Sequence, residues 1–261
     1  MLRFIRQWLD RRLIERHSIT AAEWQLAITH LPLLDHLDET EHKRLRELAV
    51  LFLHRKSIDG AHGLEITRHM ALVIALQACL PVLALGIEAY DGWSSVVVYP
   101  SGFVSKRVER DEFGVEHHVS ESLSGEAWLE GPVILSWDDT EYAGIEDGYN
   151  LVIHEFAHKL DMQNGSANGF PPLHEGMDGD DWTRAFSEGF DRLQQLCEHG
   201  DEIGIDCYAV TSPAEFFAVL SETFFEQPEI LHQRFAAVYA QMKLYYRQDP
   251  LARLSSGRRR H

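Results

Sequence analysis

Apolar and polar residues alternate differently in the two parts of the chain, which predicts a helical first part and a mixed second part. In the first part, apolar residues recur at helical spacing behind residues that commonly cap helices. Helices are predicted over residues 2–16, from Ala21 to about Thr29, from Asp38 or Thr40 through the apolar positions Leu45–Leu53, and over Thr67–Leu80. Residues 1–60 are therefore expected to form an N-terminal helical lobe.

The pattern changes to strands near residue 95. Ser95–Tyr99 is β-branched and aromatic and lies between Gly92 and Pro100, which predicts a strand. Further strands are predicted at Phe103–Val104, within Val115–Leu123, and within Trp128–Trp137, most clearly at Val133–Trp137. These segments favour a small antiparallel or mixed sheet, so the expected fold class is α+β.

Helical periodicity returns after residue 150. Ser212 at an N-cap, followed by Pro213 at the first helical position, is typical of a helix start. Helices are expected over Leu151–Asp161, Trp182–Cys197, from Pro213 through Glu222, and from Pro228 to about Tyr246, with loops at Asn164–Asp181 and Gly200–Asp206. The polar, basic tail 255–261 is expected to be disordered, which leaves residues 61–254 as the second domain.

Composition and charge narrow the function classes. The chain has 261 residues, 45% of them hydrophobic, enough for one large domain or a domain with a small lobe. Its formal net charge of −17 argues against a general binder of nucleic acid or of anionic membranes. The three cysteines form no C-x-x-C motif, so a disulfide framework is not expected and a reducing cytoplasm is the natural compartment.

Two segments raise the question of a membrane. Met70–Ile87 carries no charge, but Gln77, Pro81 and Gly86 interrupt it, so a buried helix ending near Pro81 is favoured over a span. Residues 2–16 mix acidic residues among their arginines, which favours a packed surface helix over a membrane-bound one. The N-terminus also lacks the continuous apolar core of a secretory signal.

The segment Leu151–Asp161 carries the main chemical signal, the motif H-E-x-x-H. On a helix, His154 and His158 lie one turn apart on one face and can hold one metal ion. Glu155 lies at the edge of that face, where it can act on a water molecule instead of the metal. The alternative is a core helix with two hydrogen-bonded histidines, so the metal interpretation depends on a third ligand.

The third ligand has two candidates. The extended motif with a later glycine and histidine is excluded, because Asp161 and Asn164 occupy those positions. A carboxylate from a downstream helix is the other common solution, and Glu215 and Glu222 lie seven apart on one helical face. The alternatives are that Glu215 closes a capping box with Ser212 and that Glu222 is a solvated helix carboxylate. The residues alone prefer Glu215 but leave both open.

Two further sets of residues carry side chains that could belong to such a site. Asp161 is a candidate to orient a ligand histidine, although a surface aspartate is an equal alternative. His117 and His118 are adjacent on a predicted strand and would point to opposite faces, so they are not expected to share one ion.

The chain also resembles a known family. HEFAHKLDMQNG followed by YAVTSPAEFFAVLSE is similar to the Mlc titration factor A family of bacterial zinc metallopeptidases, and IALQACLP, VVVYPSGF and GPVILSW extend the similarity to nearly the whole chain. A tyrosine seven residues before a ligand glutamate also resembles the catalytic domain of anthrax lethal factor. The resemblance implies a zincin-like catalytic domain with one zinc per chain. It implies His154, His158 and Glu215 as ligands, Glu155 as base and Tyr208 as a second catalytic group.

The resemblance implies a function as well. It indicates a cytoplasmic, aminopeptidase-like zinc peptidase that cleaves peptide substrates and binds the repressor Mlc, and so influences glucose phosphotransferase genes without contacting nucleic acid itself. Tyr208 is expected to donate a hydrogen bond to the developing oxyanion, and the strand Val133–Trp137 to pair with extended substrate. The alternative is a non-catalytic protein that sequesters the repressor and holds a structural zinc. Glu155 favours the enzyme, because a structural site does not need it.

Overall fold

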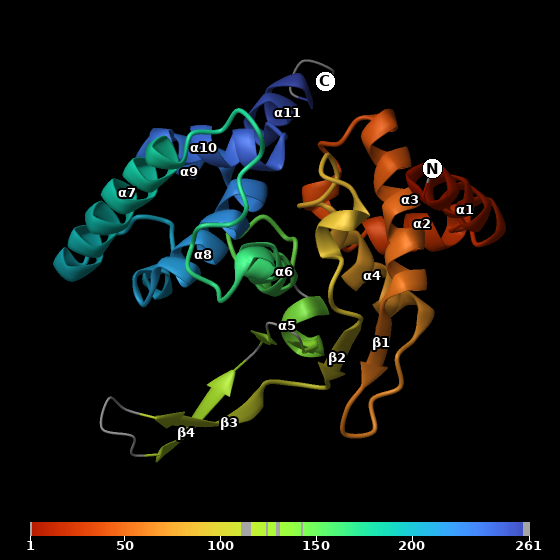
Figure 1. Cartoon of the computed structure of the whole chain (residues 1–261), viewed down its shortest axis with the longest axis horizontal. Helices are drawn as coiled ribbons and strands as arrows, with labels where there is room; N and C mark the ends of the chain where they lie inside the picture. Colours follow the sequence, from red (N-terminus) through yellow and green to blue (C-terminus); the bar gives the residue numbers. More distant parts are fainter. Residues whose placement is uncertain (1, 111–115, 124, 129–130, 142, 258–261) are drawn as a thin grey trace.

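The computed structural model describes residues 2–110, 116–123, 125–128, 131–141 and 143–257. Helices and a small sheet share the molecule, so the predicted α+β class is confirmed. Figure 1 shows the N-terminal helices on one side, the C-terminal helices on the other, and α6 (Leu151–Asp161) between them, next to the sheet. Because α6 is enclosed on several sides, all of its residues are buried.

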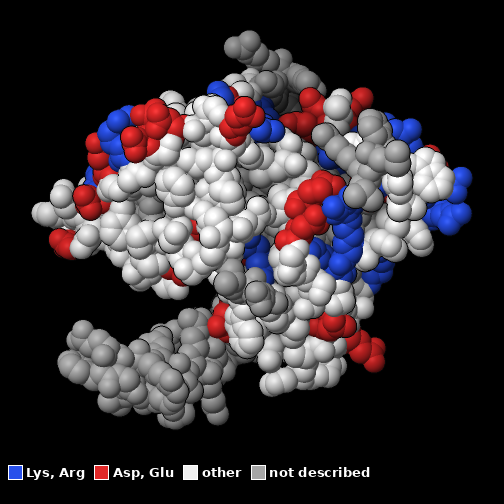
Figure 2. Space-filling view, viewed as in Figure 1, with Lys and Arg blue, Asp and Glu red and all other residues white. Residues whose placement is uncertain are grey.

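Four helices make up most of the N-terminal side, as predicted: α1 (Leu2–Arg16), α2 (Ala21–Ile28), α3 (Glu39–Arg55) and α4 (Arg68–Cys79). Thr20 forms a capping box with Glu23 at the start of α2. Asp38, and not Thr40, caps α3 through a second capping box with Glu41. These caps satisfy backbone N–H groups that have no partner within the helix. On the face shown in Figure 2, most Lys and Arg side chains lie on this N-terminal side.

The main sheet has four strands in the order β1-β2-β6-β5: β1 (Ser57–Gly60), β2 (Ser95–Tyr99), β6 (Val133–Ser136) and β5 (Gly125–Ala127). β2 pairs in parallel with both β1 and β6, whereas β5 runs antiparallel to β6, so the sheet is mixed. The sequence pattern did not reveal β1 or β5, which are only four and three residues long. The strand at 133 ends at Ser136 because α5 (Trp137–Glu141) begins at the next residue.

The position of β6 corrects one expectation. β6 lies between β2 and β5, so its backbone groups are engaged on both sides and it is not available to pair with a substrate. β5 is the edge strand on the side of α6. An extended peptide adds to a sheet at an edge strand, and among the described strands β5, not β6, lies at that edge.

A separate two-stranded hairpin consists of β3 (Phe103–Arg110) and β4 (Glu116–Leu123). It extends away from the rest of the molecule in Figure 1. His117 and His118 lie in β4, and their side chains fall outside the described part of the structure.

The C-terminal side consists of α7 (Gly179–His199), α8 (Pro213–Glu226), α9 (Pro228–Arg234), α10 (Ala236–Tyr246) and α11 (Pro250–Gly257). The single helix predicted from Pro228 to Tyr246 is divided at Phe235, whose φ of −137° and ψ of 58° are not helical. Phe235 is buried, and the apolar pattern continues on both sides of it, so periodicity cannot detect the break. α11 includes the first three residues of the predicted tail, and residues 258–261 lie outside the description.

As predicted, Met70–Ile87 contains a buried helix, and residues 2–16 form a helix at the surface. α4 is almost entirely buried and its C-cap is Leu80, directly before Pro81. Among the described helices, none combines the length and the apolar character that crossing a bilayer requires. The division of the chain at residue 60 stays a prediction, although β1 joins the last residues of that range to the main sheet.

Candidate metal centre and active site

Helix α6 places two histidines side by side. Asn150 caps its N-terminus, where the side-chain oxygen accepts a hydrogen bond from Ile153 N at 2.9 Å. One helical turn then separates His154 from His158, and their Nε2 atoms lie 3.2 Å apart. Both rings are buried, as expected for a helix whose apolar residues surround the motif.

Glu215 completes a three-residue group. Ser212 caps α8 with Pro213 at the first position, so Glu215 lies in the first turn, where its N–H donates to Ser212 Oγ. Its carboxylate does not close the capping box. Instead, Glu215 Oε2 lies 3.0 Å from His154 Nε2 and 3.3 Å from His158 Nε2. Within the described residues, these three side chains form the group of His, Cys, Asp or Glu with the spacing of a metal site.

The spacing of the three atoms fits zinc. Nitrogen and oxygen ligands at about 2.0–2.2 Å from a tetrahedral zinc lie about 3.3–3.5 Å from each other, close to the observed separations. Glu215 Oε2 is also buried and makes no hydrogen bond of good geometry. A buried oxygen of this kind needs a partner, and a cation between it and the two imidazoles supplies one.

The electrostatics of the group also favour a cation. Burial alone would lower the pKa of His154, but Glu215 and Glu222 outweigh burial and raise it. Burial alone would raise the pKa of Glu215, but the adjoining imidazoles outweigh it and lower the pKa below its usual value. Glu215 is therefore ionised at neutral pH, which is the form that binds metal.

Glu155 lies beside the ligand group and not within it. Its side chain is 4% exposed, and its Oε2 atom is buried without a hydrogen-bond partner. Burial raises the pKa of Glu155 to about 7, against the opposing effect of His154 and His158. A carboxylate with a pKa near the working pH can both accept and return a proton.

Edge strand β5 passes directly over Glu155. A Cβ atom added at Gly125 would lie 2.8 Å from Glu155 Cδ and 2.6 Å from Leu151 Cδ1, with Glu155 Oε1 closer still. Only glycine at this position leaves room for the carboxylate. The backbone of β5 and the proposed base are therefore immediate neighbours.

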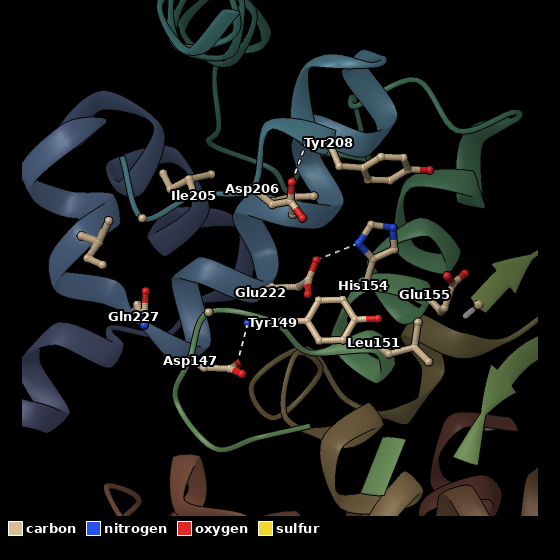
Figure 3. A pocket seen from close by; sticks show the side chains of 15 residues that line it. Asp147, Tyr149, Leu151, His154, Glu155, Ile205, Asp206, Tyr208, Glu222 and Gln227 are labelled. Atoms are coloured by element: carbon tan, nitrogen blue, oxygen red, sulfur yellow. Dashed lines mark hydrogen bonds and ion pairs between the residues drawn. The ribbon is translucent and has the colours of Figure 1, made fainter. Parts of the chain in front are cut away.

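Tyr208 reaches the group from the short helix η4 (Cys207–Val210). Its ring centroid lies 6.2 Å from that of His154, and 48% of the residue is exposed. Figure 3 shows the two rings next to each other at the edge of a cavity. The structure thus brings together His154, His158, Glu215, Glu155 and Tyr208, the five residues that the family resemblance implies.

Glu222 has a role that the sequence analysis did not assign. It is 2% exposed, so it is not a solvated helix carboxylate. Its Oε1 lies 2.7 Å from His154 Nδ1 (Figure 3), and its Oε2 accepts a hydrogen bond from Asn150 N at 2.5 Å. A carboxylate on the far nitrogen of a ligand histidine fixes the ring and its tautomer. The seven-residue spacing places Glu222 on the same face of α8 as Glu215. In the sequence, this spacing indicates only a second candidate for direct metal binding.

The expectation that Asp161 orients a ligand histidine stays a prediction. Asp161 is fully buried, and its Oδ2 accepts hydrogen bonds of 2.7 Å from the N–H groups of Asn168 and Gly169. Among the described residues, the other oxygen of Asp161, Oδ1, and the Nδ1 atom of His158 are both buried without a hydrogen-bond partner. Through its bonds to Asn168 and Gly169, Asp161 holds the loop that follows α6 against the end of that helix.

The cysteines correct another expectation. Cys197, in the last turn of α7, forms a disulfide with Cys207, the first residue of η4, with their Cα atoms 5.9 Å apart. Cys79 is free and buried. The number and spacing of cysteines gave no sign of this pair, because the turn of the chain through residues 200–206 brings them together.

The site opens into a cavity of about 790 Å³. His154, Glu155, Tyr208 and Glu222 line it, with Asp206 beside Tyr208 and Asp147 further away (Figure 3). None of the described lining residues is Lys or Arg. The cavity is therefore negatively charged and large enough for several residues of a peptide.

Comparisons with known proteins agree with this geometry. Residues 5–247 match the family model described as glucose-regulated metallo-peptidase M90. The chain is 44% identical to Mlc titration factor A of Serratia proteamaculans (strain 568), over 90% of each chain. It is 42% identical to the protein of the same name from Klebsiella pneumoniae (strain 342), over 88% of each chain. With that of Yersinia pestis (strain Pestoides F) the identity is 41%, over 89% of this chain and 87% of the relative.

Proposed function

Because the chain belongs to the glucose-regulated metallo-peptidase M90 family, we propose that it is a zinc-dependent, aminopeptidase-like peptidase with one zinc per chain. The observation that carries the proposal is the convergence of His154, His158 and Glu215 on one point, with Glu155 beside them. A structural zinc site is usually closed by four protein ligands, whereas a catalytic one keeps a position open. Three ligands at the edge of a large cavity support the catalytic form.

The proposed chemistry assigns one task to each side chain. Zinc, when bound, supplies Lewis acidity that polarises the scissile carbonyl and makes a water molecule easier to deprotonate. Glu155 accepts the proton from that water and returns it to the leaving amine, as its pKa of about 7 permits. Tyr208 donates a hydrogen bond to the carbonyl oxygen as negative charge develops there. Glu222 holds the His154 ring in place through Nδ1.

The surroundings of the site support an extended peptide with a free amino terminus. β5 is the outermost strand of the described sheet and lies beside Glu155, where the substrate backbone can add as a further strand. Asp147 and Asp206 present carboxylates to the cavity, and both residues are exposed. A negatively charged cavity favours the α-ammonium group of an aminopeptidase substrate over a blocked terminus.

The peptidase proposal is tested by Glu155→Gln. This change keeps the size of the side chain and removes its ability to take a proton. The variant should retain about one zinc per chain and lose nearly all hydrolysis of unblocked aminoacyl substrates. Wild-type turnover in Glu155→Gln would remove Glu155 as the base, and zinc without hydrolysis in the wild type would favour the non-catalytic alternative.

The names of the relatives support a partner as well. We extend the proposal to a cytoplasmic complex with the repressor Mlc, through which the protein influences glucose phosphotransferase genes. An interface of ordinary size needs about 800 Å² on each partner, so we place it on a surface outside the zinc site. Glu155→Gln should then bind purified Mlc with the affinity of the wild type. Loss of binding in a correctly folded Glu155→Gln protein would contradict separate surfaces.

A further inference from the structure

The disulfide between Cys197 and Cys207 ends one residue before Tyr208. It joins the last turn of α7 to the first residue of η4 and so closes the loop 198–206. The end of this loop lines the cavity through Gly204, Ile205 and Asp206. The disulfide therefore ties the residue directly before Tyr208 to the end of α7.

The backbone hydrogen bonds that join Tyr208 to Asp206 and Thr211 are local. Asp206 Oδ1 accepts from Tyr208 N at 2.9 Å, and Thr211 Oγ1 donates to Tyr208 O at 2.8 Å. Bonds between residues two or three apart set the shape of the turn, but they do not fix its distance from α6. That distance depends on the burial of Ala209, on the contacts of η4 with α8 and α7, and on the disulfide.

Tyr208 needs accurate placement for the proposed reaction. A hydrogen-bond donor stabilises a developing oxyanion only when it lies about 2.7–3.1 Å from it. Nearly half of Tyr208 is exposed to the cavity, so packing alone restrains its ring less than it restrains the buried ligands. A covalent restraint on the preceding residue limits how far the hydroxyl can move away.

We propose that the Cys197–Cys207 disulfide positions Tyr208 for catalysis, so that a dithiol reductant lowers the turnover of the enzyme. This inference rests on the proposed peptidase function and on the role of Tyr208 in it. Cys207 is exposed and Cys197 is half-buried, so a reductant can reach the bond, whereas the free Cys79 is fully buried.

The redox step is a thiol–disulfide exchange. A reductant of the dithiol class attacks one protein sulfur and forms a mixed disulfide, and its second thiol then releases the protein. Two electrons and two protons pass to the protein, which gains two thiols, while the dithiol becomes a disulfide. Disulfides that persist or form in reducing compartments are commonly catalytic or redox-sensing, so the pair is compatible with a cytoplasmic location.

The test uses Cys197→Ser and, as a second route, Cys207→Ser. These variants remove the disulfide without a thiol reductant in the assay, because a thiol reductant would itself bind zinc. Loosening Tyr208 should lower kcat by about 10-fold, less than the full loss of one oxyanion donor, and leave KM within about two-fold. Zinc content should not change, and amide hydrogen exchange should become faster in residues 200–211 but not in α8.

The control is the same change in a Tyr208→Phe background. If the disulfide acts through the hydroxyl, Cys197→Ser should change kcat there by less than about two-fold. Wild-type kcat in both cysteine variants, or an equal loss in the Tyr208→Phe background, would overturn the inference while leaving the peptidase proposal intact. Zinc-loaded wild-type protein without hydrolysis would overturn the proposed function, and this inference with it.

Discussion

Replacing Gly125 by alanine tests the relation between the edge strand and the proposed base. The added Cβ would lie 2.8 Å from Glu155 Cδ and 2.6 Å from Leu151 Cδ1. Carbon atoms pack best at about 3.5–4.0 Å, so either Glu155 or β5 must move by about 1 Å. Glu155 is the softer element, because its carboxylate ends a side chain whereas β5 is held in register with β6.

A displacement of that size is large for a general base. Misplacing a reacting group by about 1 Å can cost about 100-fold in rate, which corresponds to about 2.7 kcal/mol of transition-state stabilisation. We therefore expect Gly125→Ala to reduce kcat/KM by about 100-fold. The zinc content should stay at that of the wild type, because the three ligands lie on α6 and α8 and not on β5.

The assay compares hydrolysis of an unblocked aminoacyl substrate with zinc content and thermal stability. Gly179→Ala is the matched control, because a Cβ there would meet only Phe170 Cζ at 3.4 Å, an ordinary contact. Adding Glu155→Asp to Gly125→Ala shortens the crowded side chain. The fold-loss of kcat/KM in the double variant should therefore be smaller than the product of the fold-losses in the two single variants. A fully active Gly125→Ala protein would refute the placement of Glu155 beneath β5.

Three further predictions concern residues around the ligands. Glu222→Gln removes the charge on the far nitrogen of His154 and should weaken zinc binding by about 10-fold, measured by competition with a chelator; unchanged affinity would contradict the orienting role. Tyr208→Phe should keep zinc and reduce kcat by about 100-fold with little change in KM. Steady-state kinetics that show a rise in KM alone would exclude Tyr208 as the donor to the oxyanion. Burial raises the pKa of Glu226 from 4.5 to about 7, so the folded protein loses stability as pH rises through that range. Glu226→Gln should therefore raise the free energy of unfolding in urea by up to ~3 kcal/mol at pH 8 and by nothing below pH 4; equal gains at both pH values would refute the assignment.

Local signals in the sequence predicted much of this structure. Capping residues located the starts of α2, α3 and α8, and the H-E-x-x-H motif with its apolar flanks located α6. These signals depend on residues within one or two turns of each other, so a single sequence contains them completely. The structure also brings Glu215 to the histidines, which the residues alone left open.

The missed features all depend on contacts between distant segments. β5 has three residues, and its place at the edge is defined only by its pairing with β6. The buried bond from Glu222 to His154 joins residues 68 positions apart, and the disulfide forms because the loop 200–206 turns back. Nothing in the periodicity of either segment records such an approach, because periodicity describes one element at a time.

The central claim is that His154, His158 and Glu215 hold a catalytic zinc beside Glu155. The most direct test is the zinc-to-protein ratio, by elemental analysis, of the wild type, Glu215→Ala and Glu222→Gln after dialysis against a weak chelator. We expect about one zinc per chain in the wild type, almost none in Glu215→Ala, and partial retention in Glu222→Gln. A Glu215→Ala protein that keeps its zinc while Glu222→Gln loses it would contradict the account.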